Sequence, residues 1–292
     1  VQWNLTYNIS VVDLTSAIVQ TEDDGFVLAG CAGSYDSYRD SWFWEAFLVK
    51  IDANGNVMWK KIYSRAKSFT KILLVQTYDG GFAITTPTSN GNNITLIKTD
   101  TNGIVEWLQT YNAYTWDIAS SVLQTEDGGF ILLIWSTDGI LRLLKTDAKG
   151  SFQWNQIFEL PKWDLESALI QVHDGSIAFA VNNMLKRTDT AGNLQWGQTF
   201  SDGTFKALIQ TADGSFTLAG SFKGDIWVAK TNKNGFVQWE QFYSGVLIKT
   251  NASKIITTSN KELEKKRTSV IVFFPLLLAI VTLAWFTKGR KE

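Results

Sequence analysis

The residues best suited to chemistry gather in the stretch 31–45, which reads CAGSYDSYRDSWFWE. Aromatic rings alternate there with carboxylates and one guanidinium. Rings stack on the apolar faces of sugars or fill pockets of a protein partner, while planar charged groups fix orientation. We therefore predict a binding site for protein or glycan, with these candidate residues: Tyr35, Asp36, Tyr38, Arg39, Asp40, Trp42 and Trp44. The alternative is a loop that folds its own aromatics over the sheet beneath it.

A catalytic site finds less support. A carboxylate pair of glycosidase type could be drawn from Asp36, Asp40, Asp117 and Asp164. That chemistry depends on the separation of the two carboxylates, which a sequence does not give. The only histidine, His173, stands where the related segments carry Glu, Tyr or Ala, which disfavours a Ser-His-Asp triad or a histidine metal cluster. We expect no enzyme activity, no metal and no cofactor, and keep a hydrolase or lyase as the weaker alternative.

Composition narrows the class of protein further. The chain has 292 residues, a net charge of −1 and a single cysteine, Cys31. One cysteine excludes an intramolecular disulfide and a cysteine zinc cluster. No basic block interrupts the first 243 residues, so we expect no nucleic-acid partner.

The elements that must position the candidate residues are seen best in the stretch 121–158. Four apolar runs rich in β-branched and aromatic residues occur there, at 121–124, 130–134, 141–145 and 152–158. Each has the length of a strand, none has a helical period, and turn residues separate them. Glycine in the turns at 126–129 and 147–150 tolerates positive φ, and Asp147 can cap its own turn. The stretch therefore predicts a four-stranded antiparallel meander.

This unit occurs five times. One motif (Gln, two residues, Asp, one residue, Gly or Ser, then an apolar residue) begins at Gln20, Gln76, Gln124, Gln171 and Gln210. A second (Asp or Asn, two residues, Gly, three residues, Trp) ends at Trp59, Trp107, Trp154, Trp196 and Trp239. The spacing is in the range of roughly 40 to 50 residues that propeller blades use. We predict an all-β propeller of four-stranded blades, in which the repeated Gln amides satisfy backbone groups between blades and the repeated Trp side chains pack.

The second motif, which follows a strand ending in Lys-Thr-Asp, resembles the tryptophan-docking motif of quinoprotein-type β-propellers. In that family a Trp from each blade packs on its neighbour. The Gln-Thr-x-Asp-Gly-Gly-Phe repeat is also similar to that of archaeal and bacterial cell-surface repeat proteins, which are predicted propellers. The resemblance covers Val1 to about Tyr243 and implies architecture. Quinoprotein dehydrogenase activity is disfavoured, because the adjacent cysteine pair of many such enzymes is impossible with one cysteine.

Strand alternation indicates which end of the propeller binds. In a four-stranded meander the first and third turns lie at one end, and the second turn and the connection to the next blade lie at the other. The first and third turns are uniform in this sequence, whereas the second turns and the connections between blades vary. The end that carries the variable segments is therefore the predicted binding face. Its connections add four candidate residues: Trp116, Asp117, Trp163 and Asp164.

The chain opens within a repeat. Residues 1–7, VQWNLTY, match 237–243, VQWEQFY, at Val, Gln, Trp and Tyr, which makes Trp3 a sixth repeat tryptophan. After the fifth repeat, two short apolar runs at 246–250 and 255–258 could join this N-terminal strand in an incomplete sixth blade. We favour six blades over five or a fragment of a larger ring.

A second kind of element follows the repeats. Residues 269–287, SVIVFFPLLLAIVTLAWFT, are uncharged and long enough to cross a bilayer as a helix. We expect a propeller domain at 1–259, a charged spacer at 260–268, the transmembrane helix at 269–287 and a basic tail at 288–292. Basic residues flank the span in similar numbers, so they do not decide its orientation. We expect the propeller outside the cell and a short cytoplasmic tail; a tail-anchored cytoplasmic propeller is the alternative.

Glycosylation sequons occur about as often as chance gives. They lie at Asn4, Asn8, Asn93 and Asn251. Together these features predict a membrane-anchored, surface-displayed propeller that binds an unknown protein or glycan through its variable face. The alternative functions are a scaffold for membrane-protein assembly and, less favoured, a carboxylate-based hydrolase or lyase of glycans.

Overall fold

The computed structural model describes residues 3–38, 40–66, 71–88, 93–111, 117–136, 139–159, 166–200 and 203–244. The predicted span at 269–287, its flanking spacer and tail, the runs at 246–250 and 255–258, and the sequon at Asn251 lie outside these ranges. Within them, no helix is both long enough and apolar enough to span a membrane.

The described residues form five four-stranded antiparallel sheets, and in each sheet the strands follow chain order. The strands are β1 (Val12–Gln20), β2 (Phe26–Asp36), β3 (Ser41–Ile51) and β4 (Val57–Ala66); β5 (Leu73–Gln76), β6 (Phe82–Pro87), β7 (Ile94–Thr99) and β8 (Val105–Tyr111); β9 (Asp117–Gln124), β10 (Phe130–Ser136), β11 (Ile140–Thr146) and β12 (Phe152–Glu159); β13 (Ser167–Gln171), β14 (Ile177–Val181), β15 (Met184–Thr188) and β16 (Leu194–Thr199); β17 (Thr204–Gln210), β18 (Phe216–Phe222), β19 (Asp225–Thr231) and β20 (Val237–Tyr243).

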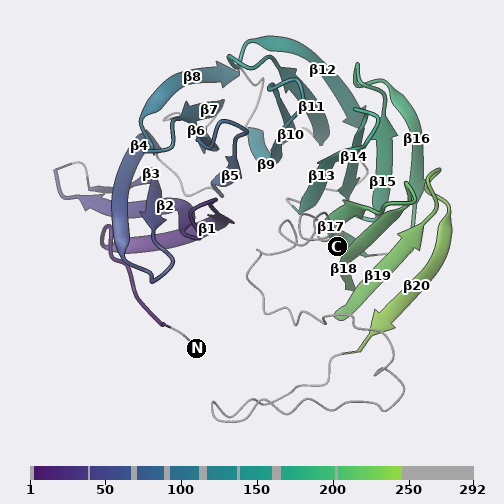
Figure 1. Ribbon diagram of the computed structural model, residues 1–292, viewed down its shortest axis with the longest axis horizontal. Helices are drawn as coiled ribbons and strands as arrows, with labels where there is room; N and C mark the ends of the chain where they lie inside the picture. Colours follow the sequence, from purple (N-terminus) through teal and green to yellow (C-terminus); the bar gives the residue numbers. More distant parts are fainter. Residues whose placement is uncertain are drawn as a thin grey trace, which may run out of the picture.

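The sheets stand side by side as the blades of a β-propeller, with β1, β5, β9, β13 and β17 innermost and the fourth strand of each sheet on the outside (Figure 1). This confirms the predicted all-β architecture of stacked meanders. The described blades form an arc that is open between the first sheet and the fifth (Figure 1). Each of the four runs predicted in the third repeat lies within one of the strands β9 to β12.

The turns follow the chemistry that the sequence predicts. In the third blade, one carboxylate oxygen of Asp147 accepts hydrogen bonds from the backbone N–H groups of Lys149 and Ser151, at 2.9 and 2.7 Å. Gly150 ends the same turn with φ of 76°, a conformation that L side chains rarely adopt. The turn is thus closed by its own aspartate and its own glycine.

The core lies between blades. Four clusters of buried apolar side chains each join two adjacent sheets; the one between the third and fourth blades includes Leu143 and Phe179, both fully buried. A fifth cluster is different, because Tyr7 and Ile9 of the N-terminal segment pack there against Phe47 and Val49 of the first blade. A single sheet could not bury both of its faces, so stacking supplies the hydrophobic stabilisation.

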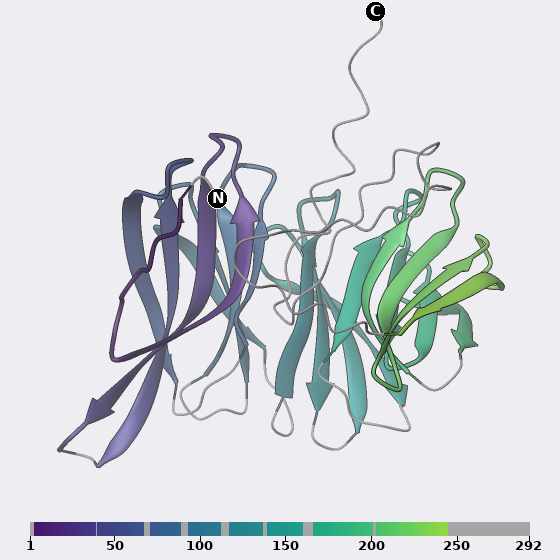
Figure 2. The same ribbon diagram turned by 90° about the horizontal axis from the view of Figure 1, so that it is seen from below.

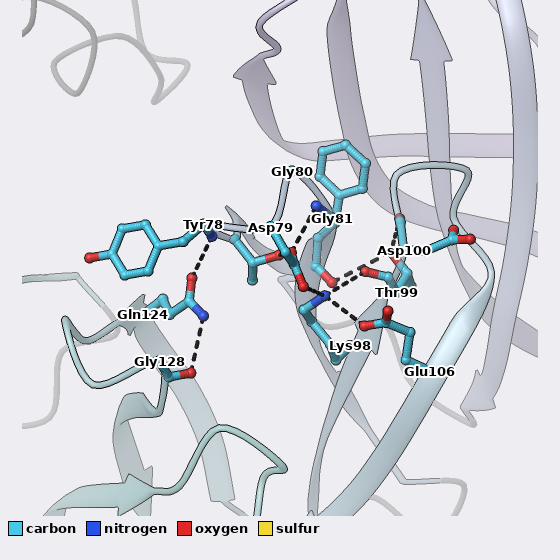
Figure 3. A network of polar contacts seen from close by, with 12 residues as sticks. Tyr78, Asp79, Gly80, Gly81, Lys98, Thr99, Asp100, Glu106, Gln124 and Gly128 are labelled. Carbon is cyan, nitrogen blue, oxygen red and sulfur yellow. Dashed lines mark hydrogen bonds and ion pairs between the residues drawn. The ribbon is translucent and has the colours of Figure 1, made fainter.

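Glutamine side chains link the blades by hydrogen bonds. The side-chain oxygen of Gln124 accepts from the backbone N–H of Tyr78 in the second blade, and its nitrogen donates to the carbonyl of Gly128 in its own turn (Figure 3). Gln171 and Gln210 repeat the arrangement, with Glu126 and His173 as their inter-blade donors. These three glutamine side chains thus each join two adjacent blades.

An ion pair in each blade joins the first turn to the third strand. Buried Lys98 contacts Asp79 at 2.8 Å and also Glu106 at 2.7 Å (Figure 3). Lys50, Lys145 and Lys230 pair in the same way with Asp23, Asp127 and Asp213, and Arg187 replaces lysine in the fourth blade, paired with Asp174. These lysines, and Arg187 in the fourth blade, therefore connect the first turn of each described blade to its third strand.

Tryptophan docking also recurs around the arc. The ring of Trp107, on the outer strand of the second blade, lies so close to Gly150 of the third blade that a Cβ there would be 2.5 Å from it. Trp59, Trp154 and Trp196 meet Gly103, Gly192 and Gly235 in the same way. Each of these rings therefore rests on the glycine turn of the next blade.

The N-terminal segment contacts the glycine turn of the first blade as the outer strands contact the glycine turns of the other blades, but it does not form a strand. Residues 3–8 have no assigned secondary structure, so the prediction that they form a strand is wrong for the described part of the chain. Even so, the indole N–H of Trp3 donates to the carbonyl of Ala53, and the Tyr7 hydroxyl donates to the carbonyl of Gly55 at 2.7 Å. Tyr63 and Tyr111 make the equivalent bonds to Gly103 and Gly150.

Candidate functional site

The aromatic stretch 31–45 forms a long β-hairpin. Strands β2 and β3 stay in register as far as the pair Asp36 and Ser41, and Asp40 at the tip has φ of 50°. The alternative interpretation, a loop folded over the sheet, is wrong: small and aromatic residues extend the two strands instead. Figure 2 shows this hairpin projecting beyond the other blades, at the end opposite the β1–β2 and β3–β4 turns. The prediction that the second turn lies away from the first and third is confirmed.

Three aromatic side chains form a row along the hairpin. Tyr35 and Trp42 lie with ring centroids 5.8 Å apart, and Trp42 stacks on Trp44 at 6.4 Å with an angle of 26° between the ring planes. Trp44 packs on the core beside Gly33, whereas Tyr35 and Trp42 are each close to half exposed. The aromatics do not all fold back over the blade, and two rings face solvent from a two-stranded support.

The charged residues of the hairpin shape its tip. Asp36 accepts a hydrogen bond from the backbone N–H of Tyr38, whose side chain is fully exposed, and Asp40 accepts from the Tyr35 hydroxyl. The Asp40 carboxylate raises the pKa of the Tyr35 phenol above its ordinary value, and burial adds to the effect. Both carboxylates therefore hold the tip in its conformation. Arg39 lies outside the described residues.

The candidate residue Asp117 lies elsewhere and has a different environment. It begins β9 in the third blade, is buried, and forms an ion pair of 3.2 Å with buried Arg142 on β11. Arg142 also donates to the Ser136 hydroxyl. Asp117 is therefore not an exposed contact residue, and it lies on a different sheet from Asp36 and Asp40. Trp116, Trp163 and Asp164 lie outside the described residues.

The Asp117–Arg142 pair borders a cavity of about 220 Å³ between the second and third blades. Sequence reasoning missed Arg142 as a polar partner, although a signal was present. Arg142 is a charge placed between Leu141 and Leu143 in a run that is otherwise apolar up to the repeat lysine. A charge in a buried strand requires a buried counter-charge, because its desolvation is otherwise too unfavourable.

Across the ranges that the structure covers, no three His, Cys, Asp or Glu side chains are grouped so as to hold a metal ion. Asn4 and Asn8 are exposed, and Asn93 is half-buried at the start of β7. Cys31 is buried within β2. Among the candidate binding residues that the structure describes, Tyr35, Tyr38 and Trp42 are exposed on the hairpin.

Comparison with known proteins supports the fold. No protein-family model and no curated protein sequence matches the chain. Among solved structures, it is similar to a protein of unknown function from Bacteroides caccae, with a TM-score of 0.53 and 9% identity over 81% of this chain and 84% of the other. It is also similar to the Dos1 propeller, with a TM-score of 0.53 and 12% identity over 80% and 73% of the two chains. The WD40 domain of Neurospora crassa Pan2 matches with a TM-score of 0.52 and 9% identity over 80% and 67%. At these identities the likeness concerns the fold, which is that of a β-propeller.

Proposed function

We propose that this chain is a non-enzymatic interaction module that binds a protein partner through the β2–β3 hairpin. The proposal rests on the row of aromatic side chains formed by Tyr35, Trp42 and Trp44. They lie on a strand pair that extends beyond the other blades. Tyr and Trp are the residues most enriched where interfaces gain their binding energy, because a large ring is buried with little loss of side-chain entropy.

The regular pairing of the hairpin favours binding over a purely structural role. Cross-strand pairs continue to the tip, and the Asp40 carboxylate holds the hydroxyl of Tyr35. Exposed rings that are already ordered lose little freedom when a partner covers them. The neighbouring carboxylates Asp36 and Asp40 give the tip a negative charge, which suits a partner surface bearing lysine or arginine.

The proposal includes display at a membrane. The apolar run at 269–287 has the length of a bilayer span, and the module would be held by it with the propeller outside the cell. Protease added to intact cells tests the orientation: release of a fragment ending near residues 261–267 supports outside display. Protection until the membrane is opened would place the propeller inside and remove this part of the proposal.

Site-specific photocrosslinking in cells tests the binding surface. A photoreactive phenylalanine analogue replaces Tyr38, which is fully exposed on the hairpin, or Tyr78, which is exposed on a first turn at the opposite end. We expect a discrete protein adduct from position 38 only, and we expect it to disappear in the Trp42→Ser background. Adducts of equal yield from both positions, or none from position 38, would contradict the proposal. An adduct carrying glycan instead of protein would replace it with the glycan-binding alternative.

A further inference from the structure

The face of the fifth blade that points away from the fourth blade is not covered by another described blade. In the other blades, the equivalent face packs against the next blade along the chain. In the third blade, Leu141 and Leu143 on β11 are fully buried beneath the fourth blade. The equivalent residues of β19 are Ile226 and Val228; Ile226 is 49% exposed and Val228 is half-buried. Lys230 is likewise more exposed than Lys145. This face has the composition of an inter-blade core but is open in the described part of the chain.

The outer strand of this blade shows what would cover it. Trp239 and Tyr243 on β20 occupy the repeat positions of Trp107 and Tyr111. Trp107 rests on the Gly150 turn, and the Tyr111 hydroxyl bonds to the Gly150 carbonyl at 2.7 Å. Trp239 and Tyr243 are instead exposed. They are therefore shaped to receive a turn of the Asx-x-x-Gly type that follows a third strand.

The first blade shows the complementary surface on the other side of the opening. Its outer turn is already occupied by Trp3 and Tyr7, in the position that an outer strand of a preceding blade would take. Next to them lies a hollow of about 420 Å³ bordered by Gln20 and Phe26. In the third, fourth and fifth blades, the glutamine at the Gln20 position accepts a hydrogen bond from the preceding blade. Both borders of the opening thus have surfaces that contact a neighbouring unit elsewhere in the described arc.

The sequence after β20 contains a matching segment. Residues 247–250 read Leu-Ile-Lys-Thr and are followed by Asn251, and residues 96–99, which form most of β7, read Leu-Ile-Lys-Thr and are followed by Asp100. Asn also begins this turn in the fifth blade, at Asn232. Lys254 stands where the repeats have glycine, and Lys223, with φ of 50°, shows that this chain accepts lysine in the left-handed conformation.

We infer that residues 247–254 dock on the open face of the fifth blade as the third strand and turn of a sixth blade. Their turn would receive Trp239 and Tyr243, and residues 3–7 would lie on the outside of the same blade. The strand 247–250 would cover Ile226 and Val228, so that hydrophobic burial stabilises the contact. The ring would then close between the two ends of the propeller domain, and this inference does not depend on the function of the hairpin.

A disulfide between two introduced cysteines tests the predicted register. In four blades, the residue two positions after the docked Trp also lies beside the turn glycine of the next blade. Its Cγ would be 2.8 to 2.9 Å from a Cβ built on that glycine. The pairs are Lys61 with Gly103, Gln109 with Gly150, Gln156 with Gly192 and Gln198 with Gly235. The equivalent pair is Gln241 and Lys254. Gln241→Cys with Lys254→Cys in the full chain, with Cys31→Ala as background, should give an intramolecular disulfide, because this spacing suits one.

The matched control is Gln238→Cys with Lys254→Cys. Gln238 and Gln241 lie on the same strand but three residues apart, so their side chains point to opposite faces. We expect at least tenfold faster intramolecular oxidation for the Gln241 pair, measured by mass spectrometry of non-reduced peptides. Equal rates, or no disulfide in either variant, would overturn the inference. Disulfide-linked dimers would overturn it as well, since they would assign the face to a second copy of the chain.

A stability measurement serves if oxidation perturbs folding. Trp196→Ala removes a ring that rests on Gly235, and we expect Trp239→Ala to lower the melting temperature by a similar amount if residues 247–254 cover it. A melting temperature unchanged by Trp239→Ala would contradict the docking, because an uncovered surface ring contributes little to stability.

Discussion

The side-chain oxygen of Gln124 lies 2.8 Å from the backbone nitrogen of Tyr78 and so joins the third blade to the second. The amide nitrogen of Gln124 donates at the same time to the Gly128 carbonyl, 3.0 Å away. We predict that Gln124→Ala lowers the free energy of unfolding by about 1 to 2 kcal/mol, because two backbone groups lose a partner. Urea denaturation measures the change. Gln153→Ala, at an exposed position on β12, is the matched control and should be neutral; equal effects of the two would show that the bridge contributes nothing.

The ion pairs of the first turns make stability depend on pH. Lys50 holds the pKa of Asp23 down at about 2, with help from the Thr21 hydroxyl. The folded pKa lies below the unfolded value of about 3.9, so the contribution of Asp23 is present above pH 4 and is lost as the pH falls towards 2. The pKa values of Asp79, Asp127, Asp174 and Asp213 are lowered as well. We therefore predict that the melting temperature falls steeply between pH 4 and pH 2.

Replacing one carboxylate isolates the contribution of its pair. Asp23→Asn should lower the melting temperature at pH 7 and flatten the decline between pH 4 and pH 2, since the amide does not titrate. Asp24→Asn is the control, because Asp24 lies in the same turn, outside the contact with Lys50, and asparagine tolerates its φ of 59°. If Asp24→Asn flattened the profile as much as Asp23→Asn, the Lys50 pair would not be its source.

Much of the fold was predictable because it is local and repeated. Each strand has period-two or continuous apolar patterning, and each turn carries its own closing residues, such as Asp147 and Gly150. Residues that recur in every repeat are required by the architecture, whereas residues that vary are not. Gln124 and Trp107 recur, and they were therefore predicted to be structural. The bond partners of Gln124 could be anticipated only as a class, because the particular donor, Tyr78, depends on how two blades stack.

The candidate site was predicted less completely. The aromatic composition of 31–45 indicated binding, but the extent of β2 and β3 depends on cross-strand register, which composition does not specify. Asp117 was placed on the binding face because it lies near a variable connection. Its burial follows from a contact with Arg142, which lies 25 residues away on a different strand. In the sequence, the only sign of this long-range ion pair is that a charged residue, Arg142, interrupts an apolar run.

The buried Asp117–Arg142 pair should be important to stability and uninvolved in ligand binding. Asp117→Asn removes the carboxylate that pairs with the buried guanidinium of Arg142, and we predict a loss of about 3 to 5 kcal/mol in the free energy of unfolding. The double variant Asp117→Asn with Arg142→Met removes the buried guanidinium as well and should recover much of that loss. Chemical denaturation measures both variants. A single variant as stable as the natural protein would contradict a structural role and reopen a chemical one.

Gly150 and Gly139 allow tryptophan docking to be separated from backbone conformation. Both glycines have positive φ, 76° and 84°, so alanine at either site should destabilise the fold by about 1 to 2 kcal/mol. A Cβ on Gly150 would also lie 2.5 Å from the Trp107 ring, whereas no atom lies within 4 Å of a Cβ on Gly139. We therefore predict that Gly150→Ala costs about 1 to 3 kcal/mol more than Gly139→Ala, through overpacking. Denaturant titration of the two variants decides the matter: equal losses would mean that the ring of Trp107 moves aside freely and that docking does not hold the blades together.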